Sequence, residues 1–124
     1  MLVGLGIDVI ELEEFRAGLD DARLDEFYLP AELAYARTQA RRWESLGARL
    51  AAKRAVLRAL GADISKAAWH EVEVLRGETG EPDVRLHGSA REAADGLGVL
   101  ECRLSMTHTR TTALAIAVLE DGAS

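Results

Sequence analysis

The sequence is poor in the residues that hold small proteins together covalently or through metal ions. Its 124 residues include one cysteine, Cys102, which excludes an internal disulfide and a cysteine zinc site and fits a reducing compartment. Aromatic residues make up only 5% of the chain, so aliphatic and alanine side chains must dominate the core. No apolar run approaches the length of a membrane span, and the amino terminus lacks a signal-peptide pattern. We therefore expect a cytoplasmic protein that has no membrane partner.

Basic charge is also scarce. Fifteen lysines and arginines face 21 acidic residues, which gives a net charge of −6 and a pI near 5.1. Because general nucleic-acid binding needs a basic field, this balance argues against a nucleic-acid partner. Hydrophobic residues nevertheless reach 48%, which is enough for a chain of this length to bury a core. We expect a single domain over residues 1–124.

The apolar periodicity changes along the chain and predicts an α+β fold, in which a long helix packs on a mostly antiparallel sheet. An apolar segment at residues 2–10 predicts a buried strand ending at Asp8, whose carboxylate then needs partners. Helical spacing predicts helices at residues 11–19, 30–41, 43–60 and 89–97. Gly61 is expected to end the long helix, and Ser89 is a possible N-cap of the last one.

The second half of the chain also contains alternating polar and apolar residues. This alternation predicts two β-hairpins. The first joins residues 70–76 and 83–87 through a turn at 77–82, and the second joins residues 101–106 and 112–119.

Four basic side chains lie on and beside one face of the predicted long helix: Arg49, Lys53, Arg54 and Arg58. Arg54 and Arg58 are four residues apart, so they are surface neighbours and repel each other. Helix formation does not require this pair, which predicts that a negative group lies between them. The alternative is a solvated basic face.

Five short motifs occur in order over nearly the whole chain: Gly6–Glu11, Glu32–Tyr35, Arg49–Lys53, Gly80–Pro82 and Ser105–Thr109. Together they resemble the holo-acyl-carrier-protein synthase family of 4′-phosphopantetheinyl transferases. The resemblance implies a homotrimer with active sites at the subunit boundaries. It also implies transfer of 4′-phosphopantetheine from coenzyme A to a serine of an acyl carrier protein, with Mg2+ on the pyrophosphate.

The resemblance assigns metal and catalytic roles residue by residue. Asp8 matches one metal-ligating carboxylate, but Arg54 stands where the family has the glutamate that supplies the other protein ligand. An arginine stays protonated and cannot ligate a hard cation, so we expect the magnesium site to be weak or absent. Arg58 matches a family lysine and keeps its charge. The candidate catalytic residues are Asp8, Arg54, Arg58 and His108.

The resemblance also indicates how coenzyme A would bind. His108 and Thr109 match the segment that contacts the nucleotide part, and Gly80 and Pro82 match the adjacent turn. With the basic motif of the long helix, the candidate binding residues are Arg49, Lys53, Gly80, Pro82, His108 and Thr109. On the carrier-protein side, Glu14 and Glu26 match positions that are basic in the family, and this charge reversal should weaken attraction of an acidic carrier.

Three functions follow from these matches. The altered metal ligand favours an enzyme repurposed for a substrate of the polyketide or fatty-acid type tethered to a carrier protein or to coenzyme A, with Asp8 or His108 as acid or base and Arg54 as an electrostatic clamp. The first alternative is an active holo-acyl-carrier-protein synthase in which Arg54 and Arg58 take over part of the metal's work. The second is a non-catalytic homologue that binds coenzyme A, a carrier protein or only itself. Asp8 and Arg54 could also form only a structural ion pair.

Overall fold

The computed structural model describes residues 1–18, 21–61, 66–76 and 80–122. Its elements confirm the α+β prediction. In chain order they are β1 (Leu2–Glu11), α1 (Leu12–Ala17), η1 (Asp21–Glu26), α2 (Pro30–Arg37), α3 (Arg42–Ala59), η2 (Lys66–Glu71), β2 (Val72–Arg76), β3 (Pro82–Leu86), α4 (Gly88–Gly96), β4 (Glu101–His108) and β5 (Thr112–Glu120).

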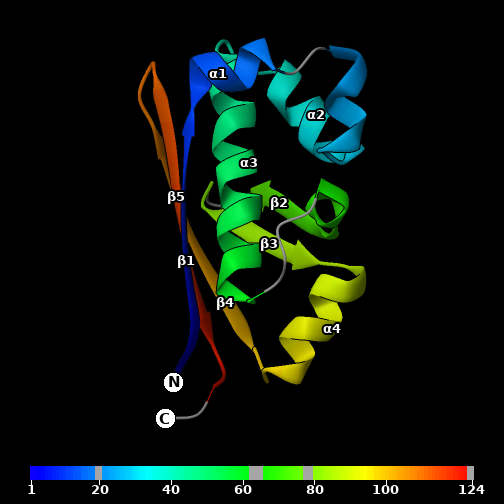
Figure 1. The fold of residues 1–124 in the computed structure, drawn as a ribbon, viewed down its shortest axis with the longest axis vertical. Helices are drawn as coiled ribbons and strands as arrows, with labels where there is room; N and C mark the ends of the chain where they lie inside the picture. Colours follow the sequence, from blue (N-terminus) through cyan, green and yellow to red (C-terminus); the bar gives the residue numbers. More distant parts are fainter. Residues whose placement is uncertain (19–20, 62–65, 77–79, 123–124) are drawn as a thin grey trace.

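The largest sheet has three antiparallel strands in the order β1-β5-β4, and α3 packs along one face of it (Figure 1). Gly6, Asp8 and Ile10 face the core, while the residues between them point to the opposite face. The sequence predicted that this strand, β1, ends at Asp8, and that prediction is wrong. The strand continues to Glu11 because β5 pairs with it as far as Thr112. Asp8 therefore lies inside the strand, beneath α3.

The hairpin predicted at residues 70–87 forms a separate sheet of β2 and β3, so the described strands are divided between two antiparallel sheets. Its first strand begins at Val72 and not at His70, because residues 66–71 form the 3-10 helix η2. Within the predicted turn, residues 77–79 lie outside the described part of the chain. Both hairpins predicted from alternating polarity are confirmed.

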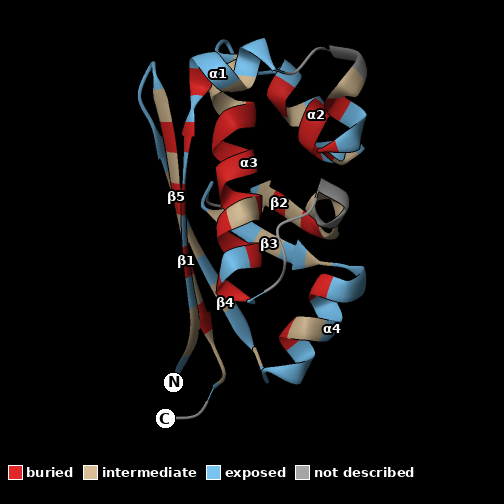
Figure 2. Cartoon of the chain, viewed as in Figure 1, coloured by how far each residue is buried: buried red, intermediate tan, exposed pale blue. Residues whose placement is uncertain are grey.

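Alanines and glycines allow α3 to approach the sheet closely. Ala51, Ala52 and Ala55 have no exposed surface, and Figure 2 shows that most of this helix is buried. A Cβ atom built on Gly6 would lie 1.8 Å from the carbonyl oxygen of Ala55, and one on Gly4 would lie 2.3 Å from that of Ala59. With side chains at these positions, α3 could not sit this close to β1. None of the described helices is both long and apolar enough to cross a bilayer.

The start of α4 is stabilised differently from the sequence prediction. The N-cap is His87 and not Ser89, and the His87 side chain makes no capping hydrogen bond to the backbone of α4. Instead, the Glu71 carboxylate accepts hydrogen bonds from Ser89 Oγ at 2.6 Å and from the Ala90 backbone N–H at 2.9 Å. The Ser89 hydrogen bond lowers the pKa of Glu71 below its ordinary value. A residue from η2 therefore satisfies the first turn of this helix.

Gly6→Ala should strongly destabilise the protein, because the added methyl group meets the backbone of α3 and no side-chain rotation can relieve the clash. We expect a loss of at least about 3 kcal/mol, measured from the urea unfolding midpoint at fixed protein concentration. The control is Gly96→Ala, whose added methyl group meets no atom within 4 Å and which should cost no stability. Equal midpoints for both variants would contradict the close packing described above.

Candidate functional site

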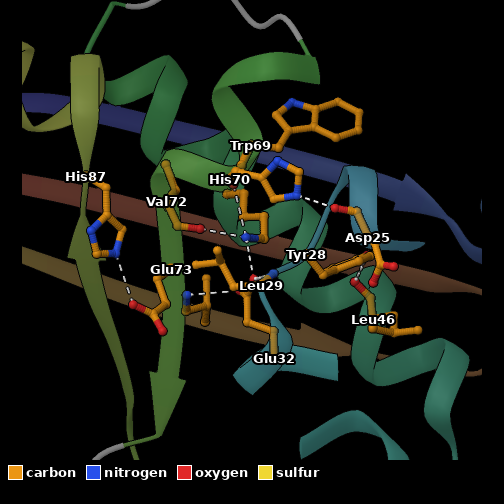
Figure 3. A network of polar contacts seen from close by, with 12 residues as sticks. Asp25, Tyr28, Leu29, Glu32, Leu46, Trp69, His70, Val72, Glu73 and His87 are labelled. Carbon is orange, nitrogen blue, oxygen red and sulfur yellow. Dashed lines mark hydrogen bonds and ion pairs between the residues drawn. The ribbon is translucent and has the colours of Figure 1, made fainter. Parts of the chain in front are cut away.

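A buried ion pair joins α2 to α3. The Lys53 ammonium donates to Glu32 Oε1 at 2.7 Å and to the carbonyl oxygens of Val72 and Trp69 at 2.6 and 3.1 Å. Neither side chain of the pair has exposed surface. Glu32 also accepts the backbone N–H groups of Leu29 and Val74 (Figure 3). The elements α2, α3, η2 and β2 thus meet at one ion pair whose hydrogen bonds are satisfied.

This arrangement corrects the expectation that Lys53 contacts coenzyme A. Burial lowers the pKa of Lys53, and the neighbouring Glu32 carboxylate opposes that shift. The ammonium donates to three protein oxygens in the interior and has no exposed surface to offer a ligand. The sequence analysis missed Glu32 as the partner because the two residues are 21 positions apart, and only the packing of α2 on α3 brings them together.

The negative group predicted between Arg54 and Arg58 is Asp8. Arg54 Nε lies 3.3 Å from Asp8 Oδ2, and Arg58 Nε lies 3.5 Å from Asp8 Oδ1. The carboxylate is only 5% exposed, whereas the guanidinium-bearing side chains are 30% and 45% exposed. Burial raises the pKa of Asp8, and the positive charges of Arg54 and then Arg58 oppose that shift. We call these three residues the Asp8 cluster.

The Asp8 cluster does not fit a magnesium ion. Mg2+ requires oxygen ligands in near-octahedral geometry. Here the only carboxylate has a guanidinium against each oxygen, so a cation beside it would meet two positive charges. Across the described residues, no group of three or more His, Cys, Asp and Glu side chains is placed to hold a metal ion. The donor set is therefore that of an ion-pair cluster.

A cavity of about 490 Å³ lies on another side of α3. Its lining includes Arg41, Ser45, Arg49, Arg76, Thr107 and His108. Arg49 is 3% exposed, and its guanidinium carbon lies 4.3 Å from the centre of the Tyr35 ring. Its Nη1 donates to Ser45 Oγ at 3.3 Å, while its buried Nε has no hydrogen-bond partner among the residues that the structure describes.

The charge of Arg49 makes this cavity a candidate anion site. Burial lowers the pKa of Arg49, and Glu32 is the largest opposing influence, yet no described carboxylate forms an ion pair with it. Arg76 contacts the same Tyr35 ring at 5.3 Å and donates to the Gly80 carbonyl oxygen at 2.9 Å. A buried, incompletely bonded cation is costly unless an anion completes it. We call this region the Arg49 cavity.

Other expected binding residues lie around the Arg49 cavity but differ in role. His108 lines it, with Nδ1 3.2 Å from Glu44 Oε2, whereas Gly80 reaches it only through Arg76. Pro82 begins β3, opposite Arg76. The hydroxyl of Thr109 accepts the backbone N–H groups of residues 111 and 112, so it shapes the β4–β5 turn. Thr109 is not part of the cavity lining.

The sequence predicted that the four basic residues of α3 lie on and beside one face, but the structure places them in different directions. At 3.6 residues per turn, Arg54 and Arg58 lie roughly 140° and 180° around the helix from Arg49. Lys53 points into the core. The Asp8 cluster involves the edge strand β1, and the Arg49 cavity involves the other edge strand, β4. Within one subunit, the two cationic sites therefore lie on opposite sides of α3.

Comparisons with known proteins identify the class to which this fold and these sites belong. A sequence model of the 4′-phosphopantetheinyl transferase superfamily matches residues 4–117. A holo-[acyl-carrier-protein] synthase of Beutenbergia cavernae is 42% identical over 97% of this chain and 99% of its own. The corresponding synthase of Koribacter versatilis is 37% identical over 98% of this chain and 100% of its own.

Solved structures of holo-acyl-carrier-protein synthases have the same fold as this chain. The holo-(acyl-carrier-protein) synthase of Bacillus anthracis, in complex with CoA (3′,5′-ADP), has 29% identity and a TM-score of 0.79 over 98% of this chain and 99% of its own. The ACPS–CoA complex of Chronobacterium ammoniagenes has 26% identity and a TM-score of 0.80 over 94% of this chain and 95% of its own. The chain therefore belongs to the 4′-phosphopantetheinyl transferase superfamily. Within that superfamily, its relatives are the holo-acyl-carrier-protein synthases.

Lys53→Met should cost about 3–5 kcal/mol of stability, because it leaves the buried Glu32 carboxylate without its counter-charge. Thermal or urea unfolding at fixed protein concentration measures the loss. Arg91→Ala is the control, because it removes an exposed pair with Asp95 that should contribute less than about 1 kcal/mol. If both variants lose stability equally, the buried pair does not have the structural role assigned to it.

Proposed function

We propose that this protein transfers 4′-phosphopantetheine from coenzyme A to a serine of a carrier protein. The observation that carries the proposal is the Arg49 cavity, where a buried guanidinium that pairs with no carboxylate of the described chain lies beside Arg76 and His108. The 3′-phosphoadenosine part of coenzyme A carries an anion suited to such a site, and the cavity volume is typical of small-molecule sites. The relatives named holo-acyl-carrier-protein synthases support the same activity.

The proposed reaction breaks one phosphorus–oxygen bond and forms another. The carrier serine oxygen attacks the phosphorus that bears pantetheine, and the bond from that phosphorus to the bridging oxygen breaks. The leaving group is 3′,5′-ADP, which keeps the bridging oxygen. The serine proton passes to solvent water at the open side of the Asp8 cluster, because Asp8 itself lies enclosed behind both arginines. Fixed positive charge beside it would stabilise the charge that develops on the bridging oxygen.

We also propose that the active site is shared between subunits of a homotrimer. The outer face of the large sheet carries Leu5, Ile7 and Val9, each 50–55% exposed, and they pair with Val118, Ile116 and Leu114 of β5. An apolar sheet face left uncovered by the described chain is typical of an interface. Contact between subunits through this face could bring the Asp8 cluster of one subunit near the Arg49 cavity of another.

A carrier protein would need a docking surface near the Asp8 cluster. A shallow groove of about 220 Å³ is lined by Phe15, Phe27, Leu50 and Trp69, with Glu14 and Arg23 also in the lining. Glu26 forms an ion pair with Arg23 at 3.5 Å. The groove therefore offers apolar contacts between charges of both signs, which favours a carrier helix that is less acidic than the family's usual partner.

A repurposed enzyme remains a second candidate, and the Asp8 cluster is the observation that favours it. A carboxylate held by two guanidiniums lacks the second acidic residue expected of the family site. Such an enzyme would bind a substrate tethered to coenzyme A or to a carrier protein, with Asp8 or His108 as acid or base. It would therefore bind coenzyme A without transferring phosphopantetheine.

Incubation of the protein with coenzyme A and a panel of apo-carrier proteins should add one phosphopantetheine group to a carrier, as read by intact mass. Arg49→Gln should weaken binding of coenzyme A and of 3′,5′-ADP about tenfold or more in calorimetry, because it removes a charge-assisted contact. Arg91→Gln, on the exposed surface of α4, is the matched control and should bind as the parent does.

The assay also separates the candidate functions. Transfer at a normal enzyme concentration supports the synthase. Binding of coenzyme A without transfer to any carrier contradicts it and favours the repurposed enzyme. Absence of both binding and transfer contradicts both.

The parent protein should have the mass of a trimer in light scattering, and Ile7→Glu should reduce that mass to one subunit, because it places a charge in the apolar sheet face. The control is Leu97→Glu, which alters an exposed leucine at the end of α4 and should leave the trimer intact. A monomeric parent, or a trimeric Ile7→Glu variant, would refute this interface.

The same proposal predicts complementation. Arg49→Gln and Arg58→Gln subunits should each have little activity alone, because each lacks one half of the site. Coexpressed, they should form mixed trimers in which some sites contain both native halves, and activity should exceed that of either variant. No gain on mixing would place both halves within one subunit.

A further inference from the structure

Two guanidiniums face a single carboxylate in the Asp8 cluster, so the cluster keeps one unbalanced positive charge. One arginine would neutralise Asp8. The second adds repulsion from a like-charged neighbour one helical turn away, which lowers helix stability. A structural ion pair does not account for this excess, whereas a bound anion would balance it.

The exposure of the three side chains indicates from which side an anion would arrive. Asp8 is almost enclosed beneath α3, while Arg54 and Arg58 are partly open to solvent. The ion-pair distances of 3.3 and 3.5 Å join Nε of each arginine to one carboxylate oxygen, and both guanidinium-bearing side chains remain partly exposed. An incoming anion therefore meets guanidinium N–H donors before it meets the carboxylate.

The contacts to Asp8 also leave bonding capacity unused. Asp8 Oδ2 and Arg54 Nε are both buried and lie 3.3 Å apart, and within the described part of the chain neither has a hydrogen-bond partner of good geometry. A guanidinium can donate two parallel N–H bonds to a phosphate, so two neighbouring guanidiniums can each bind one phosphate of a diphosphate. Buried, incompletely bonded groups of this kind favour a ligand that completes them.

We propose that Arg54 and Arg58 form a site that binds the diphosphate of coenzyme A without a divalent metal ion. This inference deepens the proposed function and rests on it for the identity of the ligand. The guanidiniums hold the phosphates that flank the bridging oxygen, and Asp8 fixes both arginines from behind. The site selects an anion where a metal centre would select a cation.

The test uses inorganic pyrophosphate as the probe, in EDTA, with the intact protein. Calorimetry should detect binding to the parent, and Arg54→Gln and Arg58→Gln should each weaken it about tenfold or more, because each removes charge-assisted hydrogen bonds. The pyrophosphate affinity of Arg54→Lys should lie between those of the parent and Arg54→Gln, because an ammonium keeps the charge but cannot bind a phosphate with two parallel bonds. Arg91→Gln is the control and should not change the affinity.

A second measurement uses Mn2+ alone, followed by electron paramagnetic resonance. The parent should bind no Mn2+ at the Asp8 cluster, and Arg54→Glu should create a site because it supplies a second carboxylate beside Asp8. Mn2+ binding by the parent that Asp8→Asn abolishes would overturn the inference. So would a parent that binds no pyrophosphate in EDTA, or an Arg54→Gln variant that binds it as well as the parent.

These outcomes are independent of the transfer assay. Pyrophosphate binding that depends on Arg54, together with no phosphopantetheine transfer, would refute the proposed function and leave the anion site standing. Transfer that requires Mg2+, with no pyrophosphate bound in EDTA, would support the function and refute the anion site.

Discussion

The close contact between α3 and β1 determines where every candidate functional group lies. Gly4 and Gly6 leave no side chain between the strand and the helix, so the carbonyl oxygens of Ala55 and Ala59 lie against the strand backbone. At this separation the next inward-facing residue of β1, Asp8, reaches the side chains of Arg54 and Arg58. A larger residue at Gly6 would push α3 away from β1 and would therefore also break the ion pairs of Asp8 with Arg54 and Arg58.

The opposite side of α3 is held by a different interaction. Lys53 and Glu32 form a buried pair that anchors the helix to α2 and β2, and breaking such a pair costs more than forming it gains. The pair therefore fixes the rotation of α3 about its axis. Once that rotation is set, Arg49 must face the cavity beside β4, and Arg54 must face the edge strand β1. One helix thereby presents two cationic sites in different directions.

The sequence predicted the main helices and strands, but not the 3-10 helices η1 and η2 or the way in which the charged side chains pair. Alternating polarity predicted both hairpins, and Gly61, with φ of 74°, ends α3 as expected because it takes a left-handed conformation that other residues avoid. The sequence also predicted an anion between Arg54 and Arg58. It did not reveal that Glu32 pairs with Lys53, or that Glu71 caps α4. Both interactions join elements distant in the chain, and no local period encodes them.

The net charge of the Asp8 cluster explains how the fold could retain a diphosphate site when Arg54 stands in place of the family's glutamate. In the family arrangement implied by the motifs, two carboxylates, a lysine and a divalent ion sum to one positive charge. Asp8, Arg54 and Arg58 also sum to one positive charge, without an ion. In the proposed anion site, the field that a diphosphate meets would therefore be similar, with two side chains as its source in place of a metal ion. What differs is rigidity, because a metal ion fixes its ligands by coordination, whereas here the buried carboxylate must orient both guanidiniums. The enclosure of Asp8 between β1 and α3 supplies that constraint, so the packing of the core and the chemistry of the site depend on the same contact.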